Sequence, residues 1–185
     1  MLKNTHRGFG MCIAIGTITA FYSRNTYEKV TPLFYSEKTG IAAAQIGITM
    51  LSAFVASTLP DIDQKFSTHR GITHAIWIPS LFLLAALFLP FTSTYKPWAF
   101  SLFFGLFLGW FSHLLGDAFS KAGIAWFYPF QKYRHYGSGA FVVKGPRGPF
   151  QPLYSVGDKR FALIPYLWWA GAGAMLLLLI KVVFR

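Results

Sequence analysis

Long apolar stretches alternate with shorter polar connections along this chain of 185 residues. Five stretches approach the ~20 apolar residues that a helix needs to cross a ~30 Å hydrocarbon core. They are residues 8–23, 41–59, 72–90, 97–116 and 162–180. The last is the clearest, and the first is the weakest because it is short and ends at an arginine. The pattern predicts an all-α membrane protein with a single domain, built as a bundle of about five transmembrane helices.

The first stretch has a competing interpretation as a signal peptide, since Lys3 and Arg7 precede a short apolar run. No small-x-small cleavage site follows it, so we expect the segment to be retained. The composition supports a membrane protein, because 54% hydrophobic residues with 12% charged residues is unusual for a soluble domain. The single cysteine, Cys12, excludes an intrachain disulfide.

Positive charge is distributed unevenly over the connections. With five spans, one side of the membrane carries the N-terminus, residues 60–71 and residues 121–161, and these hold 11 of the 17 lysines and arginines. Such a bias favours a cytoplasmic location for that side, with the N-terminus inside and the C-terminus outside. Residues 121–161 are rich in Gly, Pro, aromatic and basic residues, and we expect them to form a loop over the cytoplasmic face. Membrane charge bias explains this loop, so no nucleic-acid partner is expected.

Most of the side chains that can bind a metal ion fall on this same predicted face. Seven such residues come from four separate places in the chain, whereas the loop at residues 24–40 has no histidine. The convergence indicates one shared polar site, formed from His6, Asp61, Asp63, His69, His74, His113 and Asp117.

The spacing within two of these groups is suited to binding one metal ion. His113 and Asp117 are four residues apart, so on a helix they lie one turn from each other and can bind one ion. Pro60 is expected to end the second span, and alternation in an extended stretch would place Asp61 and Asp63 on the same side. Two adjacent carboxylates repel unless a cation or proton separates them. A polar helix end and a solvated acidic turn explain the same residues equally well.

The string HRGITH at residues 69–74 is the most informative. Gly71 permits a tight turn, and Thr73 is expected to cap the third span as His74 enters its first turn. The planar guanidinium of Arg70 suits a phosphate or carboxylate, so beside metal ligands it suggests an anionic substrate. Alternatively, Arg70 is a cytoplasmic anchor that reaches the lipid head groups.

Four strings in order resemble the YdjM family of membrane-bound metal-dependent hydrolases: THRGFG, LPDID, HRGITH and HLLGDAFSKAGIAWFYPF. The resemblance runs from Thr5 to about Phe130, and it departs at Ala75, where that family often has serine. The motif order is more distantly similar to bacterial zinc-dependent phospholipases C, which implies a multinuclear zinc site. The ligand positions that this similarity implies are His6, Asp61, His74 or His69, His113 and Asp117.

The residue types agree with a divalent metal cofactor. Mixed histidine and carboxylate ligands suit zinc, and also manganese or iron. Such an ion would lower the pKa of a bound water and polarise a phosphoryl or acyl oxygen. Asp63 or His69, if not a ligand, is the candidate general base or ligand-orienting residue, and Arg70 would hold the substrate anion. We expect hydrolysis of a phosphate or acyl ester in a membrane lipid or lipid-linked anionic substrate, at the cytoplasmic leaflet of a bacterial or archaeal inner membrane.

Two other functions stay open at this point. The same groups could bind a metal that only stabilises a membrane scaffold, or they could form an ion or proton path. An ion or proton path needs polar residues at every depth of the bilayer. The predicted spans carry no charged residue at mid-depth. Gly105 and Gly109 form a GxxxG motif that fits packing within the monomer or dimerisation, so the oligomeric state is open.

Overall fold

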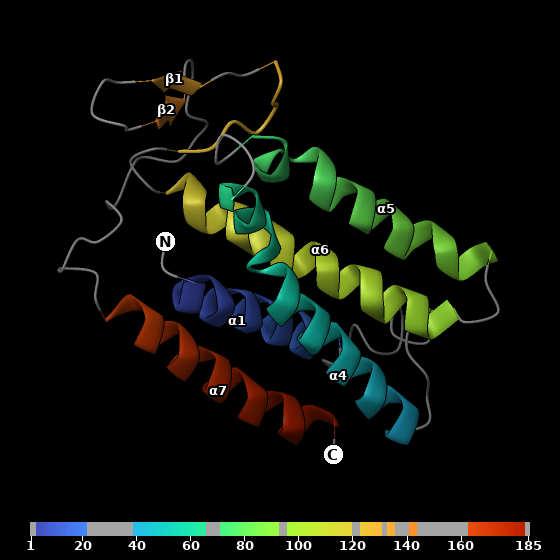
Figure 1. The fold of residues 1–185 in the computed structure, drawn as a ribbon. Coiled ribbons are helices and arrows are strands. Elements are labelled where there is room, and N and C mark those ends of the chain that lie inside the picture. Colours follow the sequence, from blue (N-terminus) through green and yellow to red (C-terminus); the bar gives the residue numbers. More distant parts are fainter. Residues whose placement is uncertain are drawn as a thin grey trace.

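The structure of the chain is a computed structural model, and it describes residues 3–21, 39–65, 71–92, 96–119, 123–130, 133–135, 141–143 and 163–183. The long helices are α1 (Lys3–Phe21), α4 (Thr39–Ala56), α5 (Trp77–Thr92), α6 (Lys96–Ala118) and α7 (Ile164–Val183). This architecture confirms the predicted helical bundle (Figure 1).

Shorter elements complete the described part of the chain. Two 3-10 helices, η1 (Leu59–Lys65) and η2 (Ile72–His74), lie between α4 and α5 in the sequence. Strands β1 (Tyr133–His135) and β2 (Phe141–Val143) pair antiparallel inside the predicted loop region. The predicted loop therefore contains a small hairpin, and most of its other residues lie outside the described ranges.

Among the described residues, three segments are long and apolar enough to cross a membrane: Ile41–Ile62, Pro97–Ala118 and Ile164–Lys181. The apolar part of α5, Trp77–Leu89, is shorter. The predicted count of five spans is therefore not confirmed. One physical reason is that Gly71 to Ile76 forms a separate turn, so α5 begins five residues later than the predicted third span.

Helix α6 lies at the centre of the bundle, with α4, α5 and α1 packed around it, while α7 packs on α1 (Figure 1). The main core cluster joins side chains from all five helices. On α6 it contains Phe100, Phe104 and Leu108, and Ile15 of α1 is 1% exposed within it. Burial against α6 therefore fixes the positions of the helices that surround it.

Close contact between α4 and α6 depends on two glycines. A Cβ at Gly105 would lie 2.4 Å from the backbone oxygen of Thr49, and a Cβ at Gly109 would lie 2.1 Å from that of Ala53. Only a residue without a side chain fits at these distances. The GxxxG motif of α6 therefore serves packing within the monomer, one of the two interpretations that the sequence allowed.

The alternating helix directions bring several helix termini to one end of the bundle. The beginnings of α1 and α5 lie there with the last turns of α4 and α6, and η1 and η2 lie beside them (Figure 1). This end therefore gathers the predicted metal-binding side chains that the structure describes.

Candidate metal centre

His113 and Asp117 lie one turn apart on α6, as their spacing predicts, and they are 0% and 1% exposed. The Nδ1 atom of His113 lies 2.8 Å from the backbone oxygen of Ser57. Because a carbonyl oxygen only accepts hydrogen bonds, Nδ1 must be the protonated nitrogen and donate to it. In a neutral imidazole, Nε2 of His113 then carries an unprotonated lone pair.

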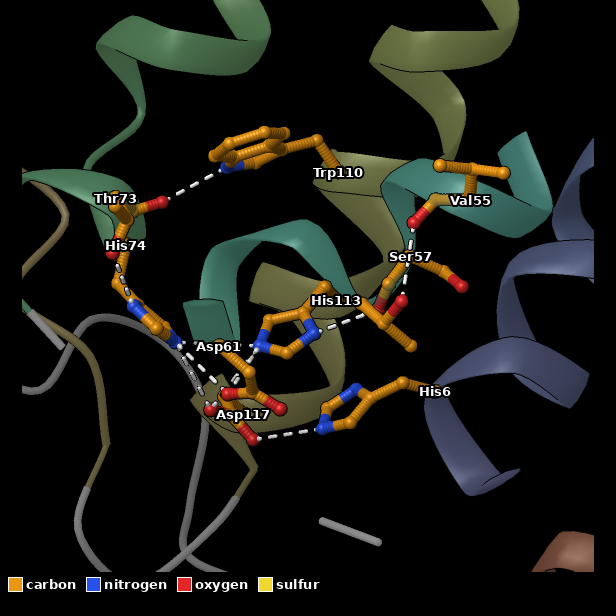
Figure 2. Close-up of polar contacts among 10 residues, drawn as sticks. His6, Val55, Ser57, Asp61, Thr73, His74, Trp110, His113 and Asp117 are labelled. Carbon is orange, nitrogen blue, oxygen red and sulfur yellow. Dashed lines mark hydrogen bonds and ion pairs between the residues drawn. The ribbon is translucent and has the colours of Figure 1, made fainter. Parts of the chain in front are cut away.

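This lone pair faces three other metal-capable groups (Figure 2). Nε2 of His113 lies 3.3 Å from Nε2 of His74, 3.5 Å from Oδ1 of Asp61 and 3.7 Å from Oδ2 of Asp117. Nε2 of His74 lies 3.8 Å from the same oxygen of Asp61 and 3.6 Å from that of Asp117. Four buried or nearly buried atoms thus converge on one point.

The convergence fits a single cation. Ligand atoms that bind one tetrahedral zinc at ~2.1 Å lie roughly 3.4 Å from one another. Five separations among the four atoms are between 3.3 and 3.8 Å, and Asp61, His74, His113 and Asp117 each offer a ligand atom within 4.8 Å of the others. Without a cation or an added proton, two carboxylates and the lone pair of His113 would repel one another. The donor set therefore fits zinc or another divalent transition metal.

A second layer of polar contacts orients the two imidazoles. The hydroxyl of Thr73 lies 3.0 Å from Nδ1 of His74, and the indole nitrogen of Trp110 donates a 2.9 Å hydrogen bond to the backbone oxygen of Thr73. The Thr73 hydroxyl on His74 and the Ser57 carbonyl on His113 thus engage the ring nitrogens that face away from the centre, and Trp110 holds Thr73 in place (Figure 2). Metal-binding histidines are usually held in this way.

His6 lies beside the four-ligand group. Its ring stacks on His113 with a centroid separation of 3.8 Å, and its Nε2 is 3.4 Å from Oδ1 of Asp117, the oxygen that does not face His74. Within the described part of the chain, neither ring nitrogen has a hydrogen-bond partner, although His6 is 1% exposed. His6 lies outside the three candidate spans, and burial, followed by the nearby His113, lowers its pKa to about 4. At neutral pH the uncharged ring directs its Nε2 toward Asp117, where this nitrogen can interact with the carboxylate or with an ion bound near it.

The structure brings four of the predicted metal ligands into one group and places the fifth, His6, next to them. It includes His74, whereas His69 and Arg70 lie outside the described residues, so their predicted roles stay predictions. The backbone of Asp63 belongs to η1, but its side chain is not among those described.

Two local predictions were wrong. Asp61 and Asp63 do not lie in an extended stretch, because residues 59–65 form the 3-10 helix η1, in which residues two apart point in different directions. Thr73 does not cap α5, because it lies within η2 and its hydroxyl contacts the adjacent His74 instead.

Ser57 and Trp110 orient the site, although neither was predicted to do so. Ser57 acts through its backbone, which no side-chain pattern reveals. Trp110 precedes His113 by three residues on α6, so its position one turn away was the available signal.

Comparison with known proteins identifies the family of the chain. No curated protein and no solved structure shows significant similarity to the chain. The model of the family described as YdjM inner membrane protein matches residues 1–185. Since the match covers the whole chain, the protein belongs to the YdjM family of inner membrane proteins.

Proposed function

We propose that this protein is a membrane-embedded metal-dependent hydrolase that acts on a phosphate or acyl ester of a lipid-derived substrate at the cytoplasmic leaflet. The observation that carries the proposal is the set of ligand atoms from Asp61, His74, His113 and Asp117, with separations of 3.3 to 3.8 Å. A divalent ion bound there would polarise the ester oxygen and lower the pKa of a water.

Other residues of the chain supply the remaining functions of the proposed site. Ser57 and Thr73 hold the imidazoles of His113 and His74 in position, so little reorganisation is needed when substrate arrives. Asp61 has 8% of its side chain exposed, against 0% for His74 and His113 and 2% for Asp117. Substrate and water therefore reach the centre from the side of Asp61.

Three further residues of the proposed site are assigned from the sequence alone. Asp63 or His69 serves as general base or as an orienting residue, and Arg70 binds the substrate anion. All three belong to the connection between α4 and α5, which also contributes Asp61 and His74. The charge bias of the connections, counted with the five predicted spans, supports a cytoplasmic location for this end of the bundle.

Burial of the four ligands supports a second candidate, a non-catalytic metal-stabilised scaffold. Structural zinc sites are closed by four protein ligands, whereas catalytic sites keep a position open for water. His74, His113 and Asp117 are almost completely enclosed, which suits the structural role. Turnover is therefore the property that separates the two candidates.

Transport receives less support from the described residues. The hydroxyls of Thr49, Ser52, Ser101 and Ser112 each donate to a carbonyl of their own helix. Hydroxyls engaged in this way are less available to relay ions or protons. This local pairing favours a hydrolase or scaffold over an ion path.

The test compares purified wild-type protein with the His113→Ala and Asp117→Asn variants by elemental analysis. We expect bound metal in the wild type and little in either variant, while His135→Ala, at a histidine that the sequence analysis does not assign to the site, retains it. Release of phosphate or fatty acid from a panel of lipid vesicles is then measured. Wild-type metal content in both variants would refute the shared centre, and bound metal without turnover on any lipid, peptide or nucleotide ester would favour the scaffold.

A further inference from the structure

Residues 123–130, which we call the strap, follow α6 in the chain and pack against the beginning of α5. The backbone oxygen of Trp126 accepts a 2.9 Å hydrogen bond from the amide of Ile76. The backbone oxygen of Tyr128 accepts a 3.0 Å hydrogen bond from the indole nitrogen of Trp77. On the inner side of the strap, Ile124 is 2% exposed and belongs to a core cluster with residues of α6. The strap therefore joins the end of α6 to the start of α5.

The strap is attached next to a metal ligand. Ile76 follows His74 by two residues, and Ala75 between them is 0% exposed. On the other side of His74, the indole of Trp110 holds the backbone of Thr73. The short helix η2, which carries His74, is therefore held by α6 at one point and by the strap at another.

The outer face of α5 leads along the membrane to the strap. Trp77, Leu81, Leu84 and Phe88 are 46%, 61%, 49% and 65% exposed. Their spacing of four, three and four residues places them within a sector of about 60° on the helix, and Ala86 on the opposite side is 0% exposed. Because the protein belongs to a family of inner membrane proteins, this exposed apolar face is the side of α5 that contacts lipid.

An aromatic group continues this face at the beginning of the helix. The ring of Phe127 meets that of Trp77 edge to face, with centroids 6.0 Å apart, and Phe127 and Phe130 are 51% and 84% exposed. The candidate span of α6 ends at Ala118, five residues before the strap begins, so the strap lies near the boundary of the hydrocarbon core. Tryptophan and tyrosine are enriched at this boundary, and the hydrogen bond to Tyr128 satisfies the polar group of the Trp77 side chain.

We propose that Phe127 and Phe130 insert into the interfacial layer of the phospholipid bilayer beside Trp77, and that the strap, anchored in this way, holds His74 in the metal centre. Lipid is the occupant because the aromatic group adjoins the lipid-contacting face of α5 at Trp77, the first residue of that face. The anchor goes beyond the proposed function and does not require hydrolysis. Its effect on His74 requires only that the four-ligand group binds a metal.

The first experiment measures the depth of the strap in full-length protein, reconstituted in vesicles of phosphatidylglycerol and phosphatidylethanolamine. Cys12, the single cysteine, is replaced by alanine, and a spin label is attached at Phe130→Cys or at Leu84→Cys. The accessibility of each label to oxygen and to a water-soluble nickel complex gives its depth. We expect the label at position 130 near the lipid phosphates and the label at position 84 roughly 10 Å deeper, since α5 rises ~1.5 Å per residue.

Two results would overturn the anchor. The nickel complex could reach the label at position 130 as freely as a label in water, which would place the strap outside the bilayer. Alternatively, neither reagent could reach this label, which would show that protein and not lipid covers the strap.

The second experiment measures cobalt(II) binding in the same vesicles. Trp77→Phe removes the hydrogen bond to Tyr128 but keeps an aromatic ring. It should weaken cobalt affinity about tenfold, as when a group that orients ligands is lost, and should change the absorption spectrum of the bound cobalt. Trp98→Phe, at an exposed tryptophan near the start of α6, should change neither.

The cobalt measurement separates this proposal from the proposed function. Equal affinities and spectra in Trp77→Phe and Trp98→Phe would overturn the effect on His74. If Trp77→Phe does not fold, Phe127→Ser, which removes the ring contact with Trp77, gives the same comparison. Wild-type protein that binds no cobalt would refute the metal centre and with it the effect on His74, whereas the depth of the label at position 130 would still decide the anchor.

Discussion

Replacing Gly109 with alanine should weaken metal binding although Gly109 has no side chain that could bind a metal ion. The added Cβ would lie 2.1 Å from the backbone oxygen of Ala53, and the shortest contacts that real Cβ atoms make are near 3.0 Å. Because this neighbour is backbone and not a flexible side chain, α4 and α6 must separate by about 1 Å. Such overpacking typically costs about 1–3 kcal/mol of stability.

The displacement matters because the metal centre spans the same two helices. Asp61 follows α4 in the chain and His113 lies on α6, and metal–ligand distances tolerate only about 0.2 Å. We therefore expect Gly109→Ala to lower metal affinity by roughly ten- to a hundredfold, the range observed when groups that orient ligands are lost. Metal titration and thermal unfolding in detergent measure the two effects.

A matched variant provides the control for this prediction. Gly47 lies in α4, the helix that Gly109 of α6 contacts, but a Cβ at Gly47 would meet nothing within 4 Å. Gly47→Ala should leave metal affinity unchanged and should raise stability by up to about 1 kcal/mol, because alanine favours a helix more than glycine does. The reasoning fails if Gly109→Ala binds metal as tightly as Gly47→Ala and unfolds at the same temperature.

Three further predictions concern the centre itself. Thr73→Val, which removes the hydroxyl at 3.0 Å from His74, should reduce metal affinity about tenfold or more, and Thr73→Ser should restore it; equal affinities would exclude an orienting role. His6→Gln should retain the ion that the four-ligand group binds, and loss of metal equal to that of His113→Ala would instead make His6 a ligand. A chelator should lower the unfolding temperature of the wild type, with recovery on adding zinc, but should not affect His113→Ala; an unchanged wild type would argue against a metal that stabilises the fold.

The parts of the site that follow from helix periodicity were predictable from the sequence. His113 and Asp117 share a helix, so their four-residue spacing is enough to place them on one face, one turn apart. The choice of His74 as a member of the ligand group depends on tertiary packing, which places η2 against α6 through the hydrogen bond from Trp110. No local pattern contains that information.

The conformation around Asp61 was not predictable for a different reason. Proline disfavours the interior of a helix but suits its first turn, so Pro60 is compatible with an extended chain and with the 3-10 helix that forms. Contacts of η1 with η2 and α6 favour the helical alternative. The same uncertainty affected the start of α5, where residues 72–76 are apolar enough for a span but form a separate turn.

One face of α6 carries both apolar residues and metal ligands, at spacings that can be read from the sequence. Leu102, Leu106, His113 and Asp117 are separated by four, seven and four residues, which are spacings that return to one side of a helix. Apolar residues at the first two positions and metal ligands at the last two align a hydrophobic surface with a polar centre at its end. Leu102 is exposed, Leu106 is half-buried, and His113 and Asp117 are buried, so this one repeat leads from the surface of the bundle to the enclosed polar centre.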